Sequence, residues 1–464
     1  MNILLIQPNH RRGPEDQGVW GVTAPIGLCY IAAVLEQHQI PVEILDANAL
    51  NLSSGEVIAE IQRKKPGLVG ISLLTPDHDY CLKIVQGLNG CCPVVGGGPH
   101  ATALPDLLLK NGFDIVVRGE GEQAMLDLAQ QKAFPEIMGI SFKDSGLIIH
   151  NPDSKPLDPD TLPFPSRHLL KSSGVDIPYS STGTRNTPWA EVLTSRGCPY
   201  DCNYCNKKSL GYKFRPRSSE NIVDEIEYLV KEFGVKEFNI LDDAFNIDIK
   251  RAERICDLII ERKLNILFRC SNGIRADKVT EPLIKKMKAA GCYYLAYGIE
   301  SGSQEVLDII PKKIKLDEIR EAVRLAKKYN IEVTGFFMLG LIGDTPASMR
   351  KTIDFAKELD VDIAQFTICT PYPGTRLWDM VQKEGKLLTK NFSELHHTAG
   401  KARFIHPRAP LPEEVEQAYI QAHREFYFRP KYVIKKILAI RSLNQVKMML
   451  RGLTAIMKIN TQKR

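Results

Sequence analysis

Short apolar runs alternate with amphipathic stretches along the first part of the chain. The runs with the composition of buried strands are Ile3–Ile6, Val42–Leu45, Leu68–Ser72, Val94–Val95 and Ile115–Val117. The stretches between them that space their apolar residues as helices do are Ile26–Gln37, Glu56–Arg63 and Ala103–Lys110. Strands that alternate with helices predict an α/β fold with a parallel sheet covered on both faces. Ligands bind such sheets at the carboxyl ends of the strands.

A second alternating series runs from about Glu191 to Thr370. Its predicted strands are Glu191–Thr194, Glu237–Leu241, Ile266–Cys270, Tyr294–Tyr297, Glu332–Leu339 and Ala364–Ile368. Its amphipathic helices include Asn221–Glu232, Lys250–Arg262, Thr280–Ala289, Leu316–Lys328 and Ser348–Glu358. Proline-rich, polar stretches at 151–156 and 162–166 separate the two series, as domain boundaries often do. We therefore predict a first domain at 1–145, a linker at 146–185, a second domain at 186–385 and a helical C-terminal extension at 386–464.

The composition is that of a globular protein of two or three domains. The chain has 464 residues, of which 44% are hydrophobic and 25% charged. No segment reaches the roughly 18 apolar residues of a membrane span, and the first residues lack the basic region of a signal peptide. Eleven cysteines without a secretion signal indicate reduced thiols and predict a cytoplasmic protein. Outside one short run they are predicted to be small buried residues: Cys29, Cys81, Cys256, Cys270, Cys292 and Cys369.

The net charge of +6 is unevenly distributed. After Glu425 the chain has no acidic residue, whereas basic residues recur among apolar ones as far as Arg464. This pattern predicts a basic amphipathic helical tail. Such a tail either lies on an anionic membrane surface or an acidic partner, or packs on the protein with a solvated basic face.

Cys198, Cys202 and Cys205 form the most informative pattern in the chain. Three thiolates this close can hold three irons of a cubane iron–sulfur cluster, which leaves the fourth iron open to a small molecule. Zinc fits poorly, because a closed structural site takes four ligands and no second cysteine pair follows. The remaining alternative is a chance cluster of buried cysteines.

The spacing Cys-x3-Cys-x2-Cys, with Tyr204 before the last cysteine, resembles the radical S-adenosylmethionine (SAM) superfamily. The resemblance implies that the second series is a partial (β/α)6 barrel and that the three cysteines are the catalytic [4Fe-4S] ligands, with Tyr204 near SAM. The open iron would bind the amino and carboxylate groups of SAM. Reductive cleavage of SAM would then give a 5′-deoxyadenosyl radical that abstracts hydrogen from unreactive carbon.

Later stretches resemble the SAM-binding motifs of the same superfamily. The resemblance implies that Asp242 or Asp243 accepts a hydrogen bond from the SAM ammonium, although two aspartates before a helix can also be caps. It also implies that Glu300 and Ser301 meet the ribose or the methionyl end, and that the Gly340–Gly343 segment contacts adenine. A turn at 371–375 follows the last strand. Three arginines near the predicted cluster either tune its potential or are solvated surface residues: Arg196, Arg269 and Arg275.

The first domain resembles the flavodoxin-like cobalamin-binding domain of many radical SAM enzymes. Ser72 and Leu74 match its Ser-x-Leu motif, and Gly96-Gly97-Gly98 matches its later glycine pair; these residues would make room for the cobalamin tail. In related domains a histidine ligates cobalt from an Asp-x-His-x-x-Gly loop, but here proline precedes His10 in place of the orienting aspartate. We therefore expect cobalt without a histidine ligand, with His10 as the alternative. A cofactor-free domain is the other alternative, and His78 is interpreted as a polar loop residue.

The layout as a whole resembles the anaerobic magnesium-protoporphyrin ester cyclase and the enzymes that modify hopanoid lipids. It implies a cobalamin-dependent radical SAM enzyme that methylates a small-molecule, tetrapyrrole or lipid-like substrate. A flavodoxin or ferredoxin would be the reductant, the basic tail would contact a membrane or lipid, and no nucleic acid would be a partner. A radical cyclase of the same family and a non-catalytic cobalamin or redox sensor are the alternatives.

Overall fold

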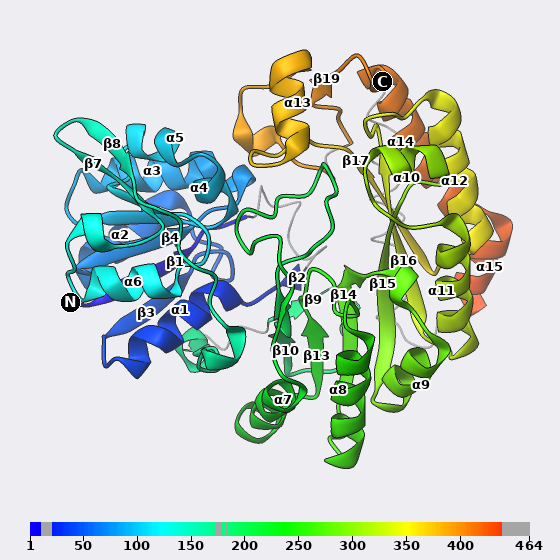
Figure 1. The fold of residues 1–464 in the computed structure, drawn as a ribbon, viewed down its shortest axis with the longest axis horizontal. Coiled ribbons are helices and arrows are strands. Elements are labelled where there is room, and N and C mark those ends of the chain that lie inside the picture. The colour runs from blue at the N-terminus through cyan, green and yellow to red at the C-terminus, as the bar shows by residue number, and fades with distance from the viewer. Residues whose placement is uncertain (11–20, 172–178, 182, 399, 439–464) are drawn as a thin grey trace.

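The computed structural model describes residues 1–10, 21–171, 179–181, 183–398 and 400–438, and two large sheets organise them (Figure 1). The first, called the front sheet, has the strand order β3-β1-β4-β5-β6-β7-β8. Its strands are β1 (Ile3–Gln7), β3 (Val42–Asp46), β4 (Leu68–Ser72), β5 (Val94–Gly97), β6 (Ile115–Val117), β7 (Ile140–Asp144) and β8 (Leu147–His150). The first five strands in this order are parallel, as predicted, but β7 and β8 join antiparallel at one edge.

Helices cover both faces of the front sheet, and a separate apolar core lies under each face. The helices are α1 (Ile26–Gln37), α2 (Ser54–Lys64), α3 (His78–Leu88), α4 (Pro99–Ala103), α5 (Pro105–Lys110) and α6 (Glu122–Ala129). Leu28 of α1 and Met125 of α6 belong to one core, whereas Val57 of α2 and Ile84 of α3 belong to the other. The predicted flavodoxin-like arrangement is confirmed. Helices α3 and α6 were not predicted from the spacing of apolar residues.

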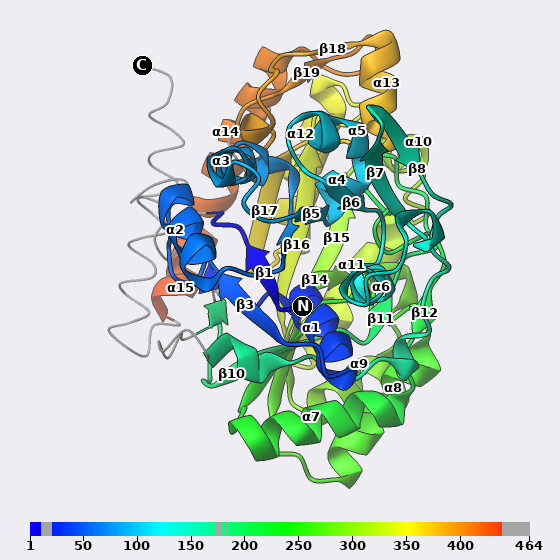
Figure 2. The same ribbon diagram turned by 90° about the vertical axis from the view of Figure 1, so that its left-hand side faces the viewer.

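The second sheet, called the barrel sheet, contains six parallel strands in the order β10-β13-β14-β15-β16-β17. Its strands are β10 (Trp189–Val192), β13 (Glu237–Ile240), β14 (Leu267–Ile274), β15 (Cys292–Glu300), β16 (Glu332–Leu339) and β17 (Ile363–Ile368). The helices outside it are α7 (Ser219–Phe233), α8 (Ile249–Glu261), α9 (Glu281–Ala289), α10 (Gln304–Ile309), α11 (Leu316–Lys328) and α12 (Pro346–Leu359). The predicted partial barrel is confirmed, and Figure 2 shows the front sheet lying before it.

Side-chain caps explain why the helices of the barrel begin where they do. Ser218, Asp248, Thr280 and Thr345 each accept a hydrogen bond from a backbone N–H of the first turn of α7, α8, α9 and α12. Gly234 ends α7 in the left-handed region, at φ +62°. Capping chemistry thus fixes the βα units that hold the carboxyl-end loops in place.

The C-terminal extension contains α13 (Arg376–Glu384), the hairpin of β18 (Lys386–Leu387) and β19 (Phe404–Ile405), α14 (Pro412–Tyr427) and α15 (Pro430–Leu438). In Figure 1 the orange segment around α13 lies above both sheets, whereas α14 packs against α12 and β17. The first residues of the basic tail are attached to the barrel, because Lys435 pairs with Asp362 at 2.9 Å and Lys431 with Asp360 at 3.3 Å. The rest of the predicted tail, including Lys447, Arg451 and Lys458, lies outside the described residues.

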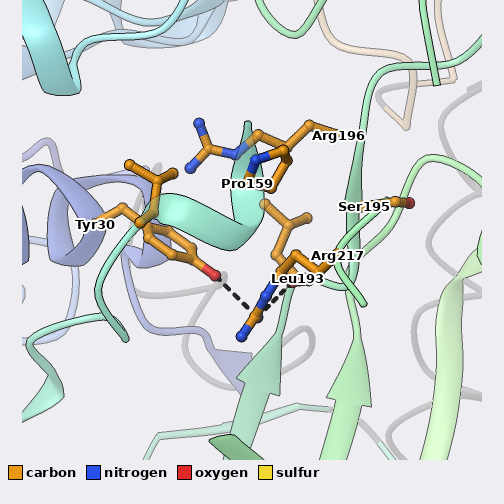
Figure 3. Close-up of a pocket in the computed structure, with 7 residues that line it drawn as sticks. Tyr30, Pro159, Leu193, Ser195, Arg196 and Arg217 are labelled. Atoms are coloured by element: carbon orange, nitrogen blue, oxygen red, sulfur yellow. Dashed lines mark hydrogen bonds between the residues drawn. The ribbon is translucent and has the colours of Figure 1, made fainter. Parts of the chain in front are cut away.

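A buried polar seam joins α1 of the front sheet to the barrel (Figure 3). Arg217 donates to the hydroxyl of Tyr30 at 3.2 Å and to the carbonyl of Leu193 at 2.9 Å. Glu225 of α7, fully buried, pairs with both Arg217 and Arg167. These contacts fix the two sheets relative to each other, while the exact domain boundaries stay a prediction. Within the described residues, no helix has both the length and the apolar character needed to span a bilayer.

Candidate functional site

The three cysteines lie on one loop, residues 197–214, which we call the cysteine loop. It follows the first barrel strand, β10, and the short antiparallel pair β11 (Ser195–Arg196) and β12 (Arg215–Pro216) closes its base. Gly197 has φ +78°, and a Cβ there would come within 2.5 Å of the carbonyl oxygen of Lys213. Only glycine fits this tight entry, so the residue before Cys198 is part of the loop's architecture.

The thiols are close enough to influence one another without converging on a single point. Cys198 and Cys202 are half-buried and Cys205 is exposed. Desolvation by the loop raises the pKa of Cys198 and Cys205, and the charge of Cys202 adds to both increases. Within the described ranges, no three His, Cys, Asp or Glu side chains are grouped to hold one metal ion. In a cubane each cysteine binds a different iron, so the three sulfurs need no common centre.

The turn at 371–375 and α13 support the cysteine loop from the C-terminal side. Asn206 donates to the carbonyl of Pro373 at 3.1 Å, and the backbone N–H of Leu377 donates to the carbonyl of Asn203 at 2.8 Å. On the other side the guanidinium of Arg275 stacks on Tyr200, 3.3 Å from the ring centroid. Arg275 is therefore a buried residue that positions the loop, not a solvated one.

Glu300, which ends β15, is held by a lysine that the sequence analysis did not single out. Its carboxylate lies 2.7 Å from Nζ of Lys312, which is also 3.4 Å from the hydroxyl of Tyr204. Glu300 itself has φ +67°, a left-handed conformation that is uncommon outside glycine. Tyr204, Glu300 and Lys312 thus form a largely buried polar group, in which desolvation first, and then the charges of Glu300 and Cys202, raise the pKa of Tyr204.

Two predicted SAM contacts are already hydrogen-bonded within the protein. Asp242 is buried and accepts hydrogen bonds from the backbone N–H of Thr194 at 2.6 Å and from the hydroxyl of Ser195 at 2.5 Å. The hydroxyl of Ser301 contacts Thr352 at 3.2 Å and is fully buried. Asp243 is exposed and its charge acts on Cys198 and Cys205, so of the two aspartates it is the one free to meet a ligand. Neither aspartate caps the next helix, because Asp248 does so.

The glycine loop after β16 is tied to the C-terminal extension. Gly340 and Gly343 have φ +79° and +91°, and the N–H of Gly343 donates to the carbonyl of Arg408 at 2.7 Å. Asp344 accepts a hydrogen bond from the N–H of Leu341 at 3.0 Å, and its burial raises the pKa of its carboxyl to about 6. The loop is therefore rigid, and its contact with adenine stays a prediction.

The carboxyl ends of β4 and β5 offer the space that the predicted cobalamin site needs. Ser72 and Gly97 are register partners there, and a Cβ on Gly97 would meet nothing within 4 Å. Gly98 has φ +90°, and Leu74 is 46% exposed, an unusual exposure for leucine next to a sheet. An open glycine beside a small hydroxyl and an exposed apolar side chain fits a large, partly apolar ligand.

His10 is oriented by a carboxylate from another loop. Its Nδ1 lies 2.7 Å from Asp77, which is 3% exposed and also accepts a hydrogen bond from the N–H of Leu74 at 3.0 Å. Asp77 thus supplies from another loop the orienting carboxylate that the motif's own aspartate position, here proline, does not provide. The Nε2 atom of His10 contacts the side chain of Gln7 at 2.6 Å. Whether cobalt takes this histidine stays a prediction.

The interpretation of His78 as a polar loop residue is wrong. His78 begins α3 and is 6% exposed, and its Nδ1 lies 2.9 Å from Nε2 of the fully buried His100. Both rings pack against Phe392 of the short 3₁₀ helix Phe392–Glu394, with centroids 4.9 and 5.0 Å away. The histidine pair therefore joins the front sheet to the C-terminal extension.

Arg196, two residues before the first cluster cysteine, connects the cysteine loop to the front sheet. It pairs with Glu122 at 2.7 Å and with Glu120 at 3.3 Å, and it is 4% exposed. Arg215 also pairs with Glu120, at 2.5 Å. Surface solvation, the alternative from sequence, is therefore wrong for Arg196.

Carboxyl-end loops of both sheets meet at one place. A Cβ on Gly374 would lie 3.0 Å from Ala103 of α4 and 3.0 Å from Asn206 of the cysteine loop. The predicted cluster site and the predicted cobalamin site therefore face the same region of the molecule.

Comparisons with known proteins agree with this arrangement. Residues 192–356 match the family model of the radical SAM superfamily, and residues 19–129 match that of the B12 binding domain. The chain is 34% identical over 454 residues to an uncharacterized methyltransferase of Pyrococcus horikoshii, covering 94% of this chain and 95% of the relative. It is 29% identical to the anaerobic magnesium-protoporphyrin IX monomethyl ester cyclase of Rubrivivax gelatinosus, covering 82% of this chain and 69% of the relative.

A solved structure has the same fold over nearly the whole chain. It is the radical SAM methyltransferase TsrM of Kitasatospora setae, with cobalamin and a [4Fe-4S] cluster bound. The TM-score is 0.71 at 19% identity, and the match covers 93% of this chain and 90% of that one.

Proposed function

Because this chain belongs to the radical SAM superfamily, in the group that also carries a B12-binding domain, we propose that it is a C-methyltransferase acting on a small molecule. It is an enzyme whose cofactors are a [4Fe-4S] cluster, SAM and cobalamin. When bound, these cofactors would generate a radical on a substrate carbon and provide the methyl group that is transferred to it. The observation that carries the proposal is that Gly374 brings Ala103 of α4 and Asn206 of the cysteine loop into close contact, because a substrate bound beside this contact would lie near both proposed cofactor sites.

The residues of the chain divide the work of binding and orientation. Cys198, Cys202 and Cys205 are proposed to hold three irons, and Asp243 is proposed to accept a hydrogen bond from the SAM ammonium. Lys312 pairs with the carboxylate of Glu300 at 2.7 Å and lies 3.4 Å from the hydroxyl of Tyr204, so it is proposed to keep the carboxylate in place beside the tyrosine. Ser72, Leu74 and the glycines at 96–98 are proposed to receive the cobalamin tail. We propose a flavodoxin or ferredoxin as the electron donor.

The proposed substrate class is based on the names of the relatives. One relative is named for a protoporphyrin ester, so a tetrapyrrole or another largely apolar small molecule is the proposed substrate. Radical cyclisation is the second candidate function and rests on the name of that same relative. The methyltransferase relative is matched over a larger share of its length and has a higher sequence identity to this chain than the cyclase does. This favours methylation.

The proposal is tested by anaerobic reconstitution with iron, sulfide, cobalamin, SAM and dithionite. We expect wild-type protein to form both 5′-deoxyadenosine and S-adenosylhomocysteine, because a second SAM molecule would remethylate cobalamin. Cys198→Ala, Cys202→Ala and Cys205→Ala should each abolish 5′-deoxyadenosine formation. Cleavage at the wild-type rate in these variants would refute the assigned ligands, and 5′-deoxyadenosine without S-adenosylhomocysteine would favour a cyclase.

A further inference from the structure

Lys207 buries a positive charge inside the cysteine loop, two positions after Cys205. The side chain is 5% exposed, and its Nζ has no hydrogen-bond partner among the described residues. Its Nζ lies over the ring of Tyr212, 5.7 Å from the centroid. The next residue, Lys208, is exposed and is an ordinary surface lysine.

A buried ammonium without a hydrogen-bond partner is costly, because it loses its hydration and gains only a long contact with the Tyr212 ring in return. The other cations around the site are already paired: Arg196 with Glu122, Arg275 with Asp277, and Lys312 with Glu300. Lys207 therefore differs from these cations in having no ion-pair partner in the described part of the chain. A negatively charged group bound after folding would supply one.

The thiols of the cysteine loop would supply that negative charge. The backbone of the loop brings Lys207 back toward Cys198, because the N–H of Cys198 donates to the carbonyl of Gly211 at 3.4 Å and the N–H of Gly211 donates to the carbonyl of Lys207 at 2.7 Å. Lys207 is thus near Cys198 in the folded loop and two residues from Cys205 in sequence. Iron binds thiolates, so cluster assembly replaces neutral thiols by fixed negative charge next to Nζ.

We propose that Lys207 is the counter-cation of the [4Fe-4S] cluster and that its charge stabilises the reduced cluster relative to the oxidised one. The inference rests on the proposed ligands Cys198, Cys202 and Cys205. One-electron reduction adds a negative charge to the cluster, and the nearby ammonium lowers the free energy of that more negative state. The net charge around a cluster is among the factors that set its potential. Lys207 is then a residue that tunes electron entry, without touching the reacting carbon.

The test compares Lys207→Met and Lys207→Gln with wild type and with Lys208→Met as the matched control. Each protein is reconstituted anaerobically, assayed for iron and sulfide, and titrated with mediators while the reduced cluster is followed by electron paramagnetic resonance. At a fixed potential we expect the ratio of reduced to oxidised cluster to fall at least tenfold in both Lys207 variants, which corresponds to a shift of about 59 mV for one electron. Lys207→Arg should recover most of this loss, and Lys208→Met should match wild type.

The dissociation constant of SAM, measured on the same samples, separates other roles of Lys207. An unchanged potential with weakened SAM binding would overturn the inference and assign the ammonium to the SAM carboxylate. An unchanged potential with unchanged SAM binding would overturn it as well. Wild-type protein that assembles no cluster would instead refute the proposed ligands, so the two failures are distinguishable.

Discussion

Nη2 of Arg196 lies 2.7 Å from Oε1 of Glu122, and this buried contact joins the base of the cysteine loop to the front sheet, which carry the proposed cluster site and the proposed cobalamin site. The two side chains are 74 residues apart in sequence. Both are almost fully screened from solvent, so each would be left with an uncompensated charge if its partner were removed. The contact therefore couples the relative position of the two cofactor sites to the stability of the fold.

Glu122→Gln should destabilise the protein and loosen the junction between the two sheets. Breaking a buried ion pair from one side typically costs about 3–5 kcal/mol, although Glu120 remains beside Arg196 and would reduce the loss. We expect a lower Tm and weaker retention of cobalamin at normal iron content. The matched control is Glu220→Gln, which removes the exposed partner of Arg254 at 3.4 Å. Equal Tm values for the two variants would contradict the role given to Arg196.

Gly97→Leu should prevent cobalamin binding without harming the fold. A Cβ at Gly97 meets open space, so a leucine can be accommodated in the protein while filling the volume meant for the ligand. We expect at least a tenfold loss of affinity for hydroxocobalamin, measured by absorbance titration, with an unchanged cluster spectrum. Gly27→Leu is the control, because its Cβ also meets nothing within 4 Å but lies at an exposed position of helix α1. Full cobalamin stoichiometry in the Gly97 variant would show that the ligand lies elsewhere.

Lys312→Met should weaken SAM binding by about tenfold or more. The substitution leaves the buried carboxylate of Glu300 without its partner at 2.7 Å and removes the contact to Tyr204. An unpaired buried carboxylate either takes up a proton or moves toward solvent, and both changes disturb the site. Calorimetric titration with SAM on cluster-loaded protein measures the effect. Lys313→Met, the exposed neighbour, should bind SAM as wild type does, and equal affinities in both variants would exclude this role.

Much of the fold could be predicted because it depends on local signals. The spacing of apolar residues predicts α1 and α11 with the same first and last residues as in the structure. Capping residues such as Ser218 and Thr280 indicate where helices begin. The antiparallel β7–β8 hairpin was missed because β8 is largely exposed and lacks a buried apolar run.

The cysteine spacing likewise predicted a cluster loop, because the three proposed ligands are close in sequence, and the structure places them on one loop. The contacts that support the site could not be predicted in this way. Asp77 reaches His10 over 67 residues, and Tyr204 meets Lys312 over 108. Such pairs are created by the packing of distant loops at the carboxyl ends of strands, and no local spacing encodes them. In the sequence, Lys312 is only one of many charged residues, and no local pattern links it to Glu300.

Acidification should loosen the contact between the front sheet and the C-terminal extension. Burial lowers the pKa of His100 to about 3, and it also lowers the pKa of His78, which Asp79 partly opposes. An opened state with solvated histidines would protonate near the ordinary pKa of about 6.5. Below that pH the opened state binds more protons than the closed one, so the contact is most stable above pH 6.5 and weakens as the pH falls toward 3. For His100 the loss is about 1.4 kcal/mol for each full pH unit.

Local hydrogen exchange around Phe392 is the suitable measurement, because the global Tm mixes this effect with an opposite one. Burial raises the pKa of Glu191 to about 8, so the folded state keeps a proton that the unfolded state loses, and stability from this group increases as the pH falls from 8 toward 4.5. After correction for the intrinsic exchange rate, we expect residues 392–396 to exchange about tenfold faster at pH 5.5 than at pH 7.5. In His100→Gln this ratio should shrink, since the amide cannot take up a proton at these pH values. A pH-independent rate in wild type, or the same ratio in both proteins, would show that the histidine pair does not govern this contact.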